Sequence, residues 1–216
     1  DNYKMQEPEV NAFFEHPILN SPYSYPDYHW ELDATGQPTQ RIINSRRQAS
    51  FFTPIPKPKK QKGKGKGEQL DLLFNANLDT QEQQYDQNSI INSVRSEVDK
   101  WRYLPSSAWR VTPETARLLD HWRNFKFSGI RPFFCQVEAV EVVIYLTEVA
   151  PQTKEGRFFL DHLTRANHDA NPEIMRLALK LATGAGKTTV MAMIIAWQTI
   201  NSVRRPTSKK FTRGFL

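Results

Sequence analysis

The chain has 216 residues, of which 39% are hydrophobic and 24% charged, so it is long enough to bury a core as one domain or two small ones. Its net charge of +6 is segregated, because residues 1–40 carry seven acidic groups and one basic group while residues 41–66 carry nine basic groups and no acidic one. With no apolar run of roughly 18 residues, an acidic start and one cysteine, the composition argues against a membrane partner, a secretory signal and an intrachain disulfide, and it favours a cytoplasmic protein.

Residues 1–67 are predicted to form an irregular arm rich in proline and aromatic residues. Proline fixes one backbone dihedral and removes a hydrogen-bond donor, so eight prolines in this stretch disfavour long helices and central strands. The stretch 57–67 (KPKKQKGKGKG) is of low complexity and predicts a solvated linker. Contact of its lysines with nucleic-acid phosphates is the alternative interpretation.

Residues 68–130 are predicted to be a helical segment. Apolar residues recur three or four positions apart along residues 88–103, as on one face of a helix. Thr112-Pro113-Glu114 combines a hydroxyl cap, a proline in the first turn and an acid at the positive end of the helix dipole. This start predicts a helix that runs to Phe125. Its expected buried side chains are Leu118, Leu119 and Trp122.

Residues 131–216 are predicted to begin an α/β P-loop motor domain of the RecA-like kind. A helix is expected over residues 136–149, with Glu138, Glu141, Tyr145 and Glu148 on one face. The polar residues 150–172 are expected to form an inserted loop with a short helix. A short buried strand is then expected over 177–182, a tight glycine loop over 183–187 and an apolar helix over 188–200.

The glycine loop carries the chemistry. Gly184 and Gly186 allow close backbone approaches that a side chain would block, so that N–H groups of the loop and the following helix can point at phosphate oxygens. Lys187 would reach the terminal phosphates, and the hydroxyl of Thr188 would ligate Mg²⁺. This order of strand, loop and helix predicts ATP binding. The loop residues assigned to it are Thr183, Gly184, Ala185, Gly186, Lys187, Thr188 and Thr189.

The stretch 181–189 (LATGAGKTT) has Leu181 where the strict P-loop pattern has its first glycine. In this it resembles motif I of superfamily 2 helicases of the DEAD/DEAH-box kind. The stretch 131–139 (RPFFCQVEA) resembles the Q motif of the same helicases. That resemblance implies that Gln136 pairs with adenine, since an amide offers both a donor and an acceptor, and that Phe133 or Phe134 stacks on the base. An ordinary glutamine at a helix start is the alternative.

The resemblance narrows further, to the Res subunit of type III restriction enzymes. Besides the two motifs, it lies in the leader segments 20–23, 29–33, 36–39, 52–60 and 111–117. It implies an ATP-dependent helicase or translocase, a hydrolase that uses ATP and Mg²⁺, moves along duplex DNA and works with a methyltransferase or modification subunit. The residues that contact DNA are not predicted.

The chain carries no aspartate or glutamate after Glu173 and no D-E-A-D or D-E-x-H string. A P-loop ATPase needs later carboxylates to hold magnesium and activate water. The chain is therefore expected to be the front part of a longer motor, with no catalytic residue of its own and no ATP turnover by itself. The strand 177–182 and the helix 188–200 are expected to be weakly supported.

Two other functions stay open at this point. One is an RNA helicase of the same superfamily, and the other is a non-catalytic nucleic-acid-binding module that retains a vestigial P-loop. The five histidines are scattered without ligand spacing, so no zinc site is expected. Cys135 is expected to be a small buried apolar residue rather than a reactive thiol.

Overall fold

The computed structural model describes residues 12–49, 89–170, 173, 175–212 and 214. The chain forms two compact units, each assembled from stretches that are separate in the sequence. The first unit comprises Asp1–Arg47, Pro113–Glu141 and Ala178–Leu216; the second comprises Gln48–Thr112 and Val142–Leu177. The predicted segments 1–67, 68–130 and 131–216 are consecutive stretches, whereas these units interleave. The linker predicted over 57–67 lies outside the described residues.

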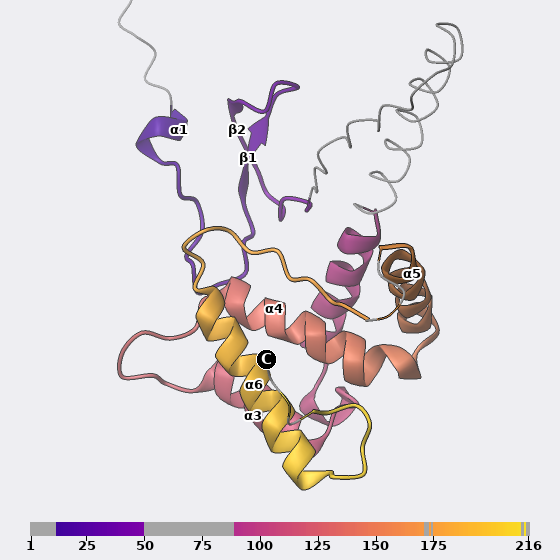
Figure 1. The fold of residues 1–216 in the computed structure, drawn as a ribbon. Coiled ribbons are helices and arrows are strands. Elements are labelled where there is room, and N and C mark those ends of the chain that lie inside the picture. The colour runs from indigo at the N-terminus through magenta and orange to yellow at the C-terminus, as the bar shows by residue number, and fades with distance from the viewer. Residues whose placement is uncertain (1–11, 50–88, 171–172, 174, 213, 215–216) are drawn as a thin grey trace, which may run out of the picture. The chain divides into compact units, whose positions relative to one another are not determined.

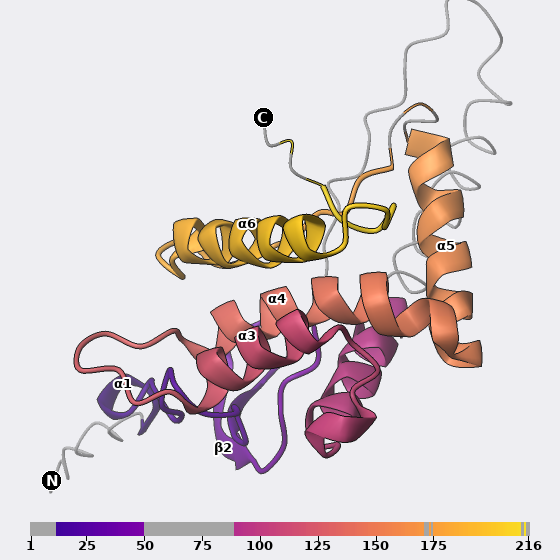
Figure 2. The same ribbon diagram turned by 90° about the horizontal axis from the view of Figure 1, so that it is seen from below.

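The first unit is built on helices α3 (Pro113–Asn124) and α6 (Lys187–Arg204) and on the beginning of α4 (Phe134–Ile144), within which the division between the units falls. Helices α3 and α6 lie side by side (Figures 1 and 2). Leu119 of α3 and Trp197 of α6 are both fully buried. Burying such side chains is the main favourable term in folding, and it joins these helices although they are far apart in sequence.

A buried polar contact adds specificity to this packing. The hydroxyl oxygen of Thr115 on α3 accepts hydrogen bonds from the indole N–H of Trp197 (3.1 Å) and from the side-chain amide of Asn201 (3.0 Å). All three residues have no exposed surface. Because an unpaired polar group is costly in an apolar interior, this arrangement fixes the register of α3 against α6.

The predicted helix from Thr112-Pro113-Glu114 to Phe125 is confirmed to within one residue by α3. Of its three expected buried side chains Leu119 is fully buried, whereas Leu118 and Trp122 are half-buried. The helix predicted over 188–200 is confirmed as α6, which begins one residue earlier and extends four residues further.

The arm is more regular than predicted. It contains a short helix, α1 (Ala12–Glu15), and two antiparallel strands, β1 (His29–Leu32) and β2 (Pro38–Ile43), visible in Figure 1. The prediction of an irregular stretch is wrong here, because residues 33–37 form a tight turn. Proline is tolerated because Pro38 opens an edge strand.

One side chain organises that turn. The carboxylate of Asp33 accepts hydrogen bonds from the hydroxyl of Thr35 (2.7 Å) and from the backbone N–H groups of Thr35 (2.8 Å) and Gln37 (2.9 Å). Gly36 has φ = 82°, a conformation that glycine adopts without penalty. These donors, the Thr35 hydroxyl first, hold the pKa of Asp33 below its ordinary value. Aspartate and glycine at these places are a turn signal in the sequence.

The second unit contains a helix over residues 89–102, the 3₁₀ turns η1 (Ser106–Ala108) and η3 (Ala150–Gln152), the π-helical turn η2 (Tyr145–Val149) and helix α5 (Lys154–Ala170). Its core includes Val98, Trp101 and Tyr145, which are at most 3% exposed. The indole N–H of Trp101 donates to the backbone oxygen of Trp109 at 2.9 Å. The helix predicted over 88–103 is confirmed.

The helix expected over 136–149 begins earlier, at Phe134, and turns into the π-helical η2 after Ile144. In this turn Glu148 is 3% exposed, and its carboxylate accepts a hydrogen bond from the backbone N–H of Thr112 at 2.7 Å. The predicted polar face therefore points inward here, and the carboxylate satisfies a donor at the start of α3.

Residues 150–172, predicted as an inserted loop with a short helix, are mostly helical, because α5 fills 17 of them. Its start has a signal in the sequence, since the hydroxyl of Thr153 accepts the N–H of Gly156 at 3.0 Å, as an N-cap does. Figures 1 and 2 show α5 as a regular helix.

The buried strand predicted over 177–182 is also wrong. These residues have no regular structure and are mostly exposed. A strand needs a hydrogen-bonded neighbour, and among the described residues the one sheet is the β1–β2 hairpin. The α/β P-loop domain thus stays a prediction. In the described part of the chain no helix is long and apolar enough to cross a bilayer.

Replacing Thr115 with valine keeps the shape of the side chain and removes the acceptor shared by Trp197 and Asn201. We expect the free energy of unfolding to fall by about 1–3 kcal/mol, the cost of depriving buried donors of an acceptor. Urea denaturation measures this change. Thr199→Val, the same change at a half-buried position on α6, is the control and should stay within about 0.5 kcal/mol. Equal losses in both variants would contradict the role given to Thr115.

Gly156→Ala should be strongly destabilising. A Cβ at this position would lie 2.3 Å from the backbone Cα and O atoms of Ala150, and neither can move without shifting η3. We expect a loss of about 2–3 kcal/mol, the upper range for overpacking, despite the better helix propensity of alanine. Gly129→Ala is the control, because a Cβ there meets nothing within 4 Å. Thermal unfolding of both variants compares them, and an unchanged Gly156→Ala would show that the contact is not tight.

Candidate functional site

The glycine loop lies at the N-terminus of α6. Gly184 and Gly186 have φ angles of 79° and 72°, in the left-handed region that favours glycine. Gly186 is the N-cap of α6, and no side chain caps the helix there. The first N–H groups of a helix have no partner within the helix, so α6 presents its positive end at this loop.

The lysine of the loop folds back over its own backbone. The ammonium group of Lys187 donates to the backbone oxygen of Ala182 at 3.1 Å, five residues earlier. The N–H of Ala185 also donates to this oxygen, at 3.3 Å, which closes the turn. The side chain of Lys187 is exposed, so a phosphate oxygen could replace the carbonyl as its acceptor.

Thr183, Thr188 and Thr189 are exposed, whereas Ala185 is half-buried. Thr188 lies in the first turn of α6, next to Lys187. The N–H of Thr189 donates to the oxygen of Gly186 at 3.0 Å and tightens the same turn. Most of the residues predicted from the loop motif are therefore exposed at the start of α6.

Gln136 lies against this loop, although it is 50 residues away in the sequence. Its side-chain nitrogen Nε2 donates to the backbone oxygen of Ala185 at 2.9 Å and, more weakly, to that of Gly186 at 3.4 Å. Its oxygen Oε1 accepts the N–H of Phe133 at 2.9 Å. The residue is 5% exposed. A Cβ on Gly186 would lie 2.3 Å from Nε2, so glycine is needed for this contact as well as for the turn.

The contacts of Gln136 orient the loop. A trans peptide holds its C=O and N–H in opposite directions. The carbonyl of Ala185 shares a peptide plane with the N–H of Gly186, and the carbonyl of Gly186 shares one with the N–H of Lys187. By drawing both carbonyls toward α4, Gln136 turns these two N–H groups to the opposite side. That is how a phosphate-binding loop needs its donors to point.

Pairing of Gln136 with adenine through both of its amide atoms would require a change of partners, since the amide is already bonded to the protein. The structure also does not bring Phe133 and Phe134 onto the loop. Their rings lie 5.5 Å from the rings of Tyr23 and Tyr25 respectively, both in the arm. The stacking predicted for them therefore competes with these aromatic contacts.

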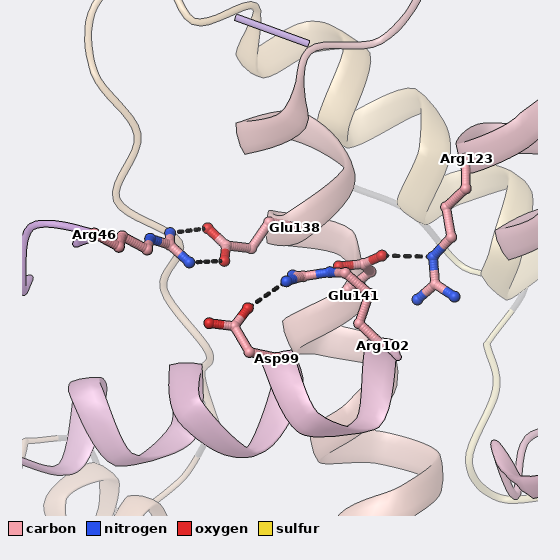
Figure 3. A network of polar contacts seen from close by, with 6 residues as sticks. All are labelled: Arg46, Asp99, Arg102, Arg123, Glu138 and Glu141. Atoms are coloured by element: carbon pink, nitrogen blue, oxygen red, sulfur yellow. Dashed lines mark hydrogen bonds and ion pairs between the residues drawn. The ribbon is translucent and has the colours of Figure 1, made fainter. Parts of the chain in front are cut away.

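An ion pair that the sequence did not reveal holds α4 beside the arm. The guanidinium of Arg46 donates to both carboxylate oxygens of Glu138, at 2.6 and 2.5 Å, as Figure 3 shows. The guanidinium also lies 5.3 Å from the ring centre of Tyr25 and 5.6 Å from that of Phe134. Paired arginine and aromatic contacts of this kind are strong when solvent is largely excluded.

A second buried pair on α4 joins it to α3. The Nε of Arg123 donates to the carboxylate of Glu141 at 2.7 Å, with the two side chains 13% and 1% exposed (Figure 3). Figure 3 also draws the pair of Arg102 with Asp99, which belongs to the second unit. Ion pairs at such low exposure cost desolvation, so their main effect is on the position of the helices they join.

Cys135, next to Gln136, is exposed, and the prediction that it is buried is wrong. Desolvation of the sulfur and the charge of Glu138 raise the pKa of the Cys135 thiol above its ordinary value. The thiol therefore stays protonated at neutral pH, which disfavours nucleophilic chemistry there.

In the described part of the chain, no three His, Cys, Asp or Glu side chains gather as a metal site would need. A cavity of about 470 Å³ lies in the second unit between the helix over 89–102 and the start of α5. None of the residues predicted to bind ATP lines it. Comparison with known proteins gives no match to a family model, to a curated protein or to a solved structure.

Gly186→Ala and Gly184→Ala should differ in their effect on Gln136. Both variants pay about 1 kcal/mol for alanine in the left-handed region. Only Gly186→Ala places a Cβ against Nε2 of Gln136, so only this variant should push the amide off the loop. The ¹⁵N–¹H spectrum of the Gln136 side-chain amide, assigned by its loss in Gln136→Ala, measures the displacement. Identical shifts in the two variants would contradict the contact.

Proposed function

We propose that the chain binds the phosphates of ATP, with Mg²⁺, through residues 183–189. The observation that supports this most is the loop itself. Two glycines in left-handed conformations lead into an α6 terminus without a side-chain cap, and the Lys187 ammonium folds over the turn. Each element favours an anion, and their combination supports the proposal of a phosphate site.

Each residue has a separate part in the proposal. The N–H groups of Gly186 and Lys187 donate to phosphate oxygens, and the Lys187 side chain leaves the Ala182 carbonyl to pair with the terminal phosphates. Thr188 is the residue that would hold Mg²⁺ through its hydroxyl. Mg²⁺ neutralises phosphate charge when it is bound. Gln136 keeps the loop carbonyls turned away from the phosphates.

The larger proposal is an ATP-dependent DNA helicase or translocase subunit of a restriction–modification system, working in the cytoplasm. It rests on the likeness of the stretch 181–189, of the stretch around Gln136 and of the leader segments to the Res subunit family. Duplex DNA and a modification subunit are the partners that it implies. The chain has no carboxylate after Glu173, so ATP hydrolysis is proposed for a motor whose further residues supply one.

Lys187→Ala should weaken ATP binding by about tenfold to a hundredfold, because it removes a charge-assisted hydrogen bond worth roughly 1.5–3 kcal/mol. Isothermal titration calorimetry with ATP and Mg²⁺ measures the affinity. Lys209→Ala removes the same charge from an exposed lysine elsewhere in the first unit and should leave it unchanged. Equal affinities of parent and Lys187→Ala, or no binding by the parent, would refute the proposed site.

The same titration with GTP separates two roles for Gln136. If Gln136→Ala loses the preference for ATP over GTP, the amide reads the base. If it weakens both nucleotides equally, the amide acts by bracing the loop. DNA binding that ignores ATP and survives Lys187→Ala would instead favour the non-catalytic module.

A further inference from the structure

We infer that the arm sets the position of Gln136 on the phosphate loop, and that Arg46 is the positioning residue through which it does so. Arg46 would then affect what the loop binds through Gln136. The identity of that ligand rests on the proposed function, whereas the mechanical link between Arg46, Gln136 and the loop does not. All of these residues lie in the first unit.

The first turn of α4 contacts both the arm and the glycine loop. Phe134 and Glu138 are four residues apart and so share a face of the helix, the face that meets the arm. Gln136 is rotated from Phe134 by about 200°, so its side chain leaves on the other side, toward the loop. Any movement of this turn away from the arm therefore changes the reach of the Gln136 amide.

The arm holds the first turn of α4 by contacts of three kinds. The guanidinium of Arg46 pairs with the carboxylate of Glu138, and the two side chains are 14% and 13% exposed. The backbone N–H of Phe134 donates to the oxygen of Pro22 at 2.8 Å. The rings of Tyr23 and Tyr25 lie against Phe133 and Phe134. Arg46 takes part in the first and third kinds, because its guanidinium also lies over Tyr25 and Phe134.

Among these contacts, those of Arg46 determine the position of the first turn of α4. A planar guanidinium that donates two short hydrogen bonds to a carboxylate fixes both the distance and the angle between the two groups, whereas contacts between aromatic rings tolerate sliding. Little solvent reaches the pair of Arg46 and Glu138, so water would replace these two hydrogen bonds poorly. Without them, the first turn of α4 can shift or fray, since helix ends lack intrahelical partners.

The position of Gln136 affects the direction of the N–H groups in the loop. The hydrogen bonds of Gln136 to the oxygens of Ala185 and Gly186 turn the N–H groups of Gly186 and Lys187 toward the phosphate side. If Gln136 is docked in only a tenth of the molecules, the apparent affinity for phosphates falls about tenfold. The arm thus sets the fraction of chains in which the loop is ready to bind.

The test is Arg46→Gln in the full chain, with Arg41→Gln as the matched control. Arg41 lies on β2, five residues before Arg46, and pairs with Glu31 at 3.5 Å, but the Arg41 side chain is 74% exposed. Two readouts are taken: the ¹⁵N–¹H signal of the Gln136 side-chain amide without nucleotide, and the affinity for ATP with Mg²⁺. We expect Arg46→Gln to move the amide signal toward that of a solvated glutamine and to weaken binding about tenfold. Arg41→Gln should change neither.

A double variant with Gln136→Ala distinguishes positioning from a general loss of stability. If Arg46 acts through Gln136, Arg46→Gln adds no further loss of affinity to Gln136→Ala. Additive losses, or an unmoved amide signal in folded Arg46→Gln, would overturn the inference. If the parent binds no nucleotide, the proposed function fails, and the amide signal alone decides this inference. If Arg46→Gln does not fold, Arg46→Lys, which keeps the charge and loses the planar guanidinium, is judged by the same signal.

Discussion

The planar peptide bond makes the loop at the start of α6 depend on one side chain. Because a carbonyl and the following N–H point in opposite directions, whatever holds the carbonyls of Ala185 and Gly186 also aims the N–H groups after them. The amide of Gln136 holds both. Glycine at 186 serves the turn through its positive φ and serves Gln136 through its missing Cβ. The position of α4 is therefore as important to the loop as the loop's own sequence.

Helix α4 is accordingly where the first unit concentrates its buried charge. Glu138 pairs with Arg46 of the arm, and Glu141 pairs with Arg123 of α3. Buried ion pairs seldom add much stability, because desolvation offsets their attraction, but they penalise every arrangement in which the partners separate. The burial of apolar side chains such as Leu119 supplies stability with less directional control. The two kinds of contact therefore act on different properties, stability and register.

The sequence predicts those parts of this structure whose causes are local. The helix over 89–102, α3 and α6 follow from apolar spacing and from caps such as Thr112-Pro113-Glu114, and the glycines of the loop follow from their motif. Helix α5 and the turn at Asp33 also have local signals in the sequence, but the polar and proline-rich composition of these stretches led to a prediction of irregular structure. The strand predicted over 177–182 fails for a different reason, since a strand exists only with a neighbour. The pairing of Arg46 with Glu138 spans 92 positions, and no local pattern in a single sequence reveals it.

The contacts of Gln136 also limit how it can read a base. An amide has two N–H donors and an oxygen with two lone pairs. Its nitrogen Nε2 donates to two loop carbonyls, and its oxygen Oε1 accepts the N–H of Phe133. Pairing with adenine through both N6 and N7 would release a loop carbonyl, and the N–H group that follows this carbonyl would then lose its orientation. Accepting one hydrogen bond from the N6 amino group at the second lone pair would not. Guanine carries an acceptor in place of that amino group, so bracing the loop and preferring adenine over guanine are compatible only through this single bond.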